Sequence, residues 1–153
     1  MTVRTTVGTT LKVTSAAPAT FDVAGYAALT FTTVGEITNL GEFGSEATLI
    51  THSSIDNKII RKFKGSVNIG SMNMTLGLDT DDAGQILMKA GQALDLPSAF
   101  ELTTQNGDIY YFQAMIMSFK PNPAGVDDVL TASCTLELTG QSGGTGIVED
   151  LAA

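Results

Sequence analysis

The sequence predicts a mainly β domain, built as a β-sandwich or small barrel flanked by one α-helix, with a long loop and extended terminal arms. Three observations support this prediction. Asn106-Gly107 lies between two strand-like runs, and Asn-Gly is the strongest short signal for a hairpin. Residues 129–139 alternate between apolar and polar side chains, as a strand does when one face covers a core. Residues 79–96 repeat their apolar side chains at the helical period.

A two-residue turn at Asn106-Gly107 would fix the register of the central hairpin. It places Phe100 opposite Gln113 and Leu102 opposite Tyr111. The second strand, residues 109–119, is apolar on both of its faces. Because a half-exposed antiparallel strand alternates, we expect its second face to be covered by the rest of the domain or by another copy of the chain.

The length of 153 residues predicts a single domain at 1–140, followed by a flexible, glycine-rich tail at 141–153. Residues 1–9 are threonine-rich and predict an extended N-terminal arm. Residues 10–14 predict a short strand, and residues 21–40 predict a second β region with a bend at Gly35.

Residues 41–57 are polar and predict a long loop containing a short strand at 47–51. Loops of this length are often functional. A basic cluster follows, with four of the eight basic residues of the chain: Lys58, Arg61, Lys62 and Lys64. Two interpretations stay open, a strand edge on which lysine blocks stray pairing or an electrostatic contact with an acidic partner.

Residues 66–78 predict a strand whose apolar positions change phase at Gly70-Ser71, which indicates a bulge. In the helix at 79–96 we expect Asp79 or Thr80 to cap the N-terminus and Asp81 and Asp82 to favour the positive end of the dipole. The expected apolar face consists of Ala83, Ile86, Leu87, Ala90 and Leu94, with Gln85, Lys89 and Gln92 facing away. Gly84 and Gly91 would permit close packing on the sheet.

Residues 120–128 predict a turn-rich loop. The strand after it, at 129–139, has two distinct faces. Its apolar face comprises Leu130, Ala132, Cys134, Leu136 and Leu138. Its polar face comprises Thr131, Ser133, Thr135, Glu137 and Thr139.

The composition excludes several classes of function. The formal net charge of −8 opposes a grip on nucleic acid, because affinity for phosphates comes from lysine and arginine. A single cysteine allows no intrachain disulfide. With no apolar signal-peptide core and no apolar run of ~18 residues, we expect a soluble protein made in the cytoplasm with no membrane partner.

We find no enzyme in the sequence and expect no catalytic residue, cofactor or metal. Residues 79–84 resemble the start of an EF-hand loop, but Ala83 and Ala90 occupy two ligand positions. His52 is the only histidine, and no nucleophile elbow, zinc motif or phosphate-binding loop accompanies it.

The order of these features resembles the tail tube proteins of long-tailed bacteriophages over residues 20–140. The most telling pieces are Gly25-Tyr26 leading into residues 34–37, and the strand that runs into residues 79–85. The resemblance implies a structural virion protein, with a β-sandwich or small barrel of the tail-tube type. Tube proteins of contractile tails and of type VI secretion share this fold and are the alternative interpretations.

The resemblance also implies an assembly. Six copies close into a ring around a channel, and rings stack head to tail, with the long loop and the arms reaching into the next ring. The implied partners are other copies of the chain, a tape-measure protein, tail-tip and tail-terminator proteins, and DNA that passes the lumen without specific binding. Assembly would take place in the cytoplasm of a bacterial host.

These implications assign two sets of candidate residues. The hypothesis for ring stacking is that the basic cluster meets acidic residues of the adjacent ring near Asp81 and Asp82. The hypothesis for the lumen is the polar face of residues 131–139. The competing interpretation is a monomeric β-sandwich that binds a ligand such as a saccharide, but the chain has no tryptophan and its aromatic residues lie mostly in strands. An enzyme is a third and weaker interpretation.

Overall fold

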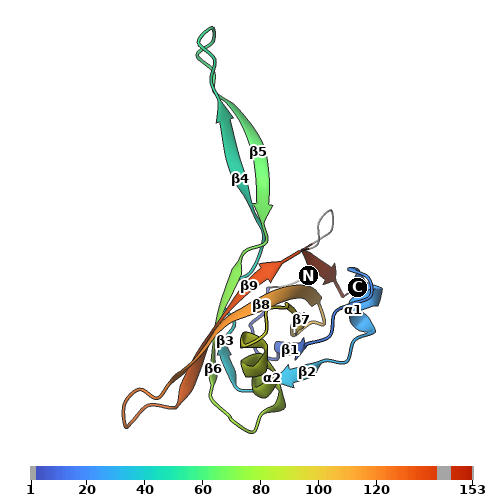
Figure 1. Cartoon of the computed structure of the whole chain (residues 1–153), viewed down its shortest axis with the longest axis vertical. Coiled ribbons are helices and arrows are strands. Elements are labelled where there is room, and N and C mark those ends of the chain that lie inside the picture. Colours follow the sequence, from blue (N-terminus) through green and yellow to red (C-terminus); the bar gives the residue numbers. More distant parts are fainter. Residues whose placement is uncertain (1–2, 141–145, 153) are drawn as a thin grey trace.

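The computed structural model describes residues 3–140 and 146–152 (Figure 1). These ranges contain two helices and ten strands. In chain order they are β1 (Thr10–Thr14), α1 (Val23–Ala27), β2 (Thr32–Val34), β3 (Ile37–Asn39), β4 (Glu46–His52), β5 (Arg61–Asn68), β6 (Ser71–Gly77), α2 (Ala83–Gln92), β7 (Ser98–Thr103), β8 (Ile109–Asn122), β9 (Thr131–Thr139) and β10 (Ile147–Asp150).

Eight of the strands form one antiparallel sheet. Its order is β2-β1-β7-β8-β9-β6-β3, and β10 pairs with β8 beside this path. β7 occupies one edge of the first half of β8, so β10 pairs along the other edge, in line with β9. β4 and β5 form a separate two-stranded sheet.

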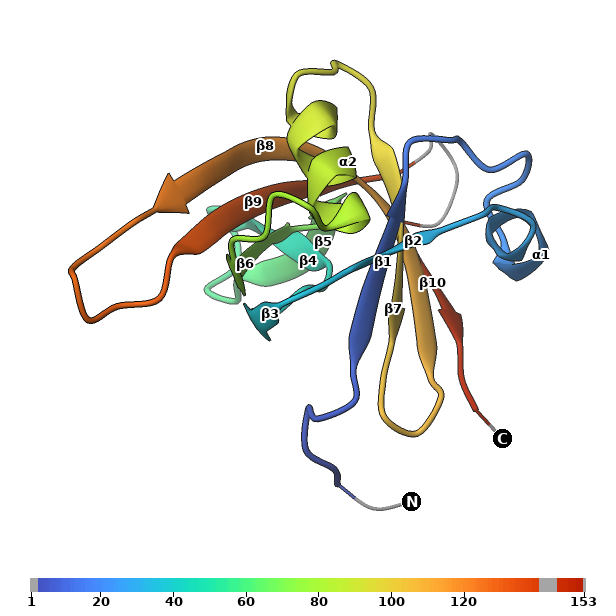
Figure 2. The same ribbon diagram turned by 90° about the horizontal axis from the view of Figure 1, so that it is seen from below.

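The main sheet curls because its two edge strands, β2 and β3, are consecutive in the chain and are joined by only Gly35 and Glu36. Figure 2 shows β2 running on into β3. The mostly β prediction is confirmed, and the curled sheet corresponds to its small-barrel version.

Gln85, on α2, joins the β2–β3 turn to the end of β6 through side-chain hydrogen bonds. Its side-chain Nε2 donates to the carbonyl oxygens of Gly35 at 3.1 Å and Gly77 at 2.8 Å, and its Oε1 accepts from the backbone N–H of Asp79 at 3.0 Å. The Asp82 carboxylate accepts from the backbone N–H groups of Gly35 at 3.1 Å and Gln85 at 3.0 Å. The start of α2 therefore holds the β2–β3 turn and the end of β6 together.

The main core fills the inside of the curled sheet. Val13, Phe100 and Phe112 are cross-strand neighbours on β1, β7 and β8, and the two phenylalanine rings stack with centroids 5.4 Å apart. A second cluster lies on the other face of the sheet, where Tyr26 of α1 stacks on Tyr111 of β8 at 5.3 Å. The second apolar face of the first half of β8 is thus covered by the same chain.

The expected register of the central hairpin is wrong by one residue. Phe100 pairs with Phe112 and Leu102 with Tyr110. The loop has three residues, because the Thr104 N–H donates to the Asp108 oxygen and the Gly107 N–H donates to the Thr104 oxygen. Gly107 has positive φ, at 94°, whereas Asn106 does not. A one-residue change in the turn exchanges the two faces of a strand.

The region at 21–40 contains a helix that the sequence did not predict. Asp22 caps α1, and its Oδ1 accepts from the Gly25 N–H at 2.8 Å. Five residues are too few to show a helical period, so only the cap marks this helix in the sequence.

The expected buried face of α2 is wrong except at Leu87, which is half-buried and packs against the main core. The helix is shorter than predicted, Asp82 caps it, and its buried residues are Gly84, Gln85, Met88 and Gly91. Ile86 is 53% exposed. A methyl group at Gly84 would overlap the Thr33 carbonyl oxygen, so close approach to β2 requires glycine and turns this face inward.

The short strand expected at 47–51 is present as β4, which pairs with β5. Three other expectations need correction. The expected bulge at Gly70 is instead a break between β5 and β6, with Gly70 at φ 101°. The expected loop at 120–128 begins later, because β8 continues to Asn122. The tail at 141–153 includes β10, while residues 141–145 and 153 lie outside the described residues.

We predict that Gln85→Leu lowers the free energy of unfolding by about 2–4 kcal/mol, because it leaves one N–H and two carbonyl groups without their partner. Urea denaturation measures the change. Gln92→Leu, on the exposed side of the same helix, is the matched control and should stay within about 0.5 kcal/mol of the parent protein. Equal effects of the two substitutions would contradict a role for Gln85 in closing the sheet.

Candidate assembly surfaces

The β4–β5 hairpin projects from the body of the molecule (Figure 1). Every residue of β4 is exposed, and so is every residue of β5 except the half-buried Gly65. Large apolar side chains are among them, with Leu49 64% and Phe63 52% exposed. An isolated two-stranded hairpin is marginally stable in water, and clustered exposed apolar side chains mark an interaction site. We therefore expect another protein surface to cover the hairpin.

Cross-strand pairing distributes the apolar and basic side chains over both faces of the hairpin. Leu49 pairs with Lys64 and Thr51 with Lys62 on one face. Ile50 pairs with Phe63 and His52 with Arg61 on the other. Because directly opposed residues share a face, each face combines apolar area with at least one cation.

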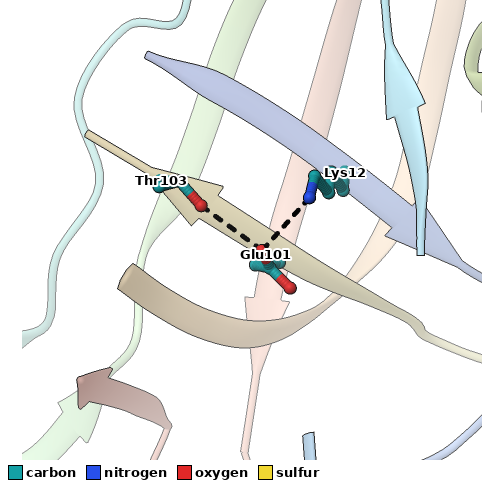
Figure 3. Close-up of polar contacts among 3 residues, drawn as sticks. All are labelled: Lys12, Glu101 and Thr103. Carbon is teal, nitrogen blue, oxygen red and sulfur yellow. Dashed lines mark hydrogen bonds and ion pairs between the residues drawn. The ribbon is translucent and has the colours of Figure 1, made fainter. Parts of the chain in front are cut away.

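The cations of the hairpin have no acidic partner in the part of the chain that the structure describes. The ion pair found there joins Lys12 to Glu101 at 3.7 Å across β1 and β7, with the Thr103 hydroxyl donating to the same carboxylate at 3.3 Å (Figure 3). Lys58, Arg61, Lys62 and Lys64 are all exposed. Their charge is available to another chain.

The acidic candidates lie on the body, at the connection from β6 to α2. Figure 1 places this connection at the bottom and the hairpin tip at the top. Asp81 is exposed, whereas the Asp82 carboxylate is held by Gly35 and Gln85. One chain therefore does not bring the basic cluster and these aspartates together. Exposed Asp127 and Asp128, on the turn from β8 to β9, are further acidic groups that the sequence did not single out.

The exposed side of α2 borders an apolar groove that the sequence analysis missed. The groove has a volume of about 450 Å³ and lies between α2 and β8. Its apolar lining is Leu78, Ile86, Ala90, Phe119 and Pro121. The signal for it was the apolar helix face, which was assigned to the core instead.

The polar face of β9 is as the alternation predicts. The apolar face of the strand is at most 6% exposed and points into the core at Ala132, Cys134, Leu136 and Leu138. Leu130, expected on the same face, is a correction, because the strand begins at Thr131 and Leu130 is 43% exposed. Ser133 is exposed, and the other polar residues of the strand are half-buried. The Thr135 hydroxyl donates to the Asn73 side-chain oxygen of β6 at 3.1 Å, so the polar face continues onto β6. Whether it lines a lumen stays a prediction at this point.

Metal-ligating side chains do not cluster in the described ranges. These ranges contain no group of three His, Cys, Asp or Glu residues that could hold a metal ion. His52 is exposed near the hairpin tip. Within the same residues, no helix has the length and apolar character to cross a membrane.

Three solved tail structures resemble the protein. A chain of the sixfold-symmetrised baseplate of the anti-feeding prophage aligns with a TM-score of 0.64 at 10% identity, over 92% of this chain and 94% of that one. A chain from the tail of the empty GTA particle, refined with C6 symmetry, aligns with 0.64 at 11% identity, over 99% and 100%. The SPP1 tail tube protein aligns with 0.62 at 18% identity, over 94% and 77%.

No family model and no curated protein matches the sequence. The structural likenesses nevertheless extend over nearly the whole chain. The chain has the fold of phage tail tube proteins.

We predict that the Cys134 thiol does not react with a thiol reagent at pH 8 until the protein unfolds. Burial raises its pKa to about 12, so the reactive thiolate is scarce, and the side chain is 1% exposed. Absorbance from Ellman-type chemistry with and without urea measures this. Ser133→Cys, one residue away on the exposed face, should react in the native protein, and rapid native reaction of the parent protein would contradict the placement of Cys134.

Proposed function

We propose that the chain is a structural tail tube protein, six copies of which close into a ring, and that these rings stack head to tail into a conduit for DNA. One observation carries the proposal, namely the β4–β5 hairpin, which is exposed along its length and apolar on both faces. Such a hairpin is completed by contact with another chain. The fold of tail tube proteins supports other copies as the source of that contact.

The arrangement of the surfaces favours stacking over a symmetric dimer. The hairpin and the β6–α2 connection lie at opposite ends of the longest axis (Figure 1). A contact between two different surfaces is heterologous, so it closes into a ring or continues as a filament. The sixfold symmetry of two of the similar structures supports six copies in a ring.

For the contact between rings, we propose that Lys58, Arg61, Lys62 and Lys64 meet acidic residues of the next ring near Asp81 and Asp82. Asp81 is the better placed of the two, because Asp82 already accepts two backbone hydrogen bonds. The proposed lumen wall is the polar face of β9. The proposed partners are a tape-measure protein inside the tube, tail-tip and tail-terminator proteins at its ends, and passing DNA.

The direct test is negative-stain electron microscopy of the purified protein, with light scattering on the same sample. Tubes or six-membered rings support the proposal. A protein that stays monomeric at high concentration, even with tail-tip components added, would favour a ligand-binding module instead. Tubes of contractile tails and of type VI secretion remain the alternatives within the class.

We predict that Arg61→Glu combined with Lys62→Glu shortens tubes by at least about tenfold, because two cations per chain become like charges facing acidic residues. Micrographs give the tube lengths, and circular dichroism checks that the monomer stays folded. Ser15→Glu with Ala16→Glu, exposed on the connection after β1, adds glutamates away from the hairpin as a control. Tubes of normal length in the hairpin variant would refute the stacking contact.

We predict that Ser133→Cys in assembled tubes reacts with a small maleimide but not with one carrying a long polymer. In the free monomer both reagents should react, because Ser133 is exposed there. Mass spectrometry measures the labelled fraction. The control is Gln92→Cys, an exposed position on α2, which lies on the opposite side of the sheet from the polar face. Equal polymer labelling of Ser133→Cys in tubes and monomers would show that the polar face does not line a closed lumen.

A further inference from the structure

We propose that the tip of the β4–β5 hairpin, residues 53–60, seats its isoleucines in the α2–β8 groove of a copy in the neighbouring ring. This inference rests on the proposed function and names the receptor surface for the hairpin. In this contact, apolar burial supplies most of the stacking affinity, and the charges orient the hairpin tip in the groove.

The tip presents apolar area that its own chain does not bury. Ile55 is 110%, Ile59 70% and Ile60 56% exposed. Burying such side chains stabilises a contact in proportion to the apolar area removed from water, and six contacts between two rings act together. Three exposed isoleucines in six positions are therefore a strong reason for an apolar receptor.

The groove offers the matching surface. Ile86 and Ala90 form one wall from α2, while Phe119 and Pro121 form the other from β8. The inward position of Gln85 leaves this wall of α2 facing out, with Ile86 53% exposed. A volume of about 450 Å³ accommodates aliphatic side chains and lies within the range of ligand sites.

Charges around the two surfaces set the direction of docking. Asp79 and Lys89 both line the groove, and exposed Asp81 follows Asp79 in the chain. The tip carries the cation Lys58 and one acid, Asp56, whose carboxylate accepts a hydrogen bond from Ser54, and Arg61 begins β5 directly after the tip. In the proposed contact Lys58 and Arg61 lie near Asp79 and Asp81.

Chemical cross-linking in assembled tubes tests this placement. Two double variants, Ile55→Cys with Ala90→Cys and Ile59→Cys with Ala90→Cys, are treated with a short bis-maleimide, and Cys134 stays unreactive because it is buried. We expect ladders of covalently linked chains on denaturing gels from tubes of at least one pair. Ile55→Cys with Ser133→Cys and Ile59→Cys with Ser133→Cys are the matched controls, because Ser133 lies on the polar face of the sheet.

The outcomes separate this inference from the proposed function. If the variants form tubes and neither groove pair links more than its control pair, the α2–β8 groove is not the receptor, although the tube stands. If the parent protein forms no tubes under any condition, the proposed function fails first. Ladders that appear in dilute monomer as well as in tubes would also overturn the inference, because they would show linkage without stacking.

Discussion

The buried amide of Gln85 is the constraint on which the rest of the structure depends. It is 2% exposed and bonds to the β2–β3 turn, to the end of β6 and to the connection before α2. These segments are the turn that joins the two edge strands, the end of β6 beside edge strand β3, and the connection that leads into α2. A buried amide with all of these partners favours a single arrangement of the segments, because leaving any partner unpaired in the core costs free energy. The same side chain fixes the orientation of α2 against the β2–β3 turn, where the two edge strands of the curled sheet meet.

The orientation of α2 also decides which of its side chains reach the surface. Because Gln85, Met88 and the two glycines face inward, Ile86 faces outward, while Leu87 is half-buried against the main core. β8 shows the complementary case: its first half is covered on both faces, by Phe112 in the main core and by Tyr111 under α1. Much of the exposed apolar area lies instead on the β4–β5 hairpin, between Leu49 and Val67, and α2 adds the exposed Ile86. This division is expected of a subunit that folds first and assembles afterwards.

The sequence predicted the parts of the fold that obey simple alternation. β9 buries Ala132, Cys134, Leu136 and Leu138 as its pattern indicates, and the hairpin at Asn106-Gly107 exists. Its register was missed because two-residue and three-residue loops share the same Asn-Gly signal. The inward face of α2 was missed because hydropathy ranks a buried glutamine and two glycines as surface residues. Hydropathy could not reveal that Gln85 has three backbone partners, two of them 50 and 8 residues away in the chain.

Only one side of the candidate contact, the basic cluster, could be predicted from the sequence. The basic cluster is visible in the sequence, and its exposure agrees with both interpretations offered for it, edge protection and electrostatic contact. Under the proposed stacking, the two would be successive states of the same residues. On a free subunit, Lys62, Lys64 and the irregular pairing between Ala47 and Leu49 discourage stray strand addition to an exposed apolar hairpin. In a stacked tube the same cations would lie against carboxylates of another chain, whose position no single-chain pattern contains. A local rule broken without compensation inside the chain is where natural sequences place function, and the hairpin is the largest such break in the described residues.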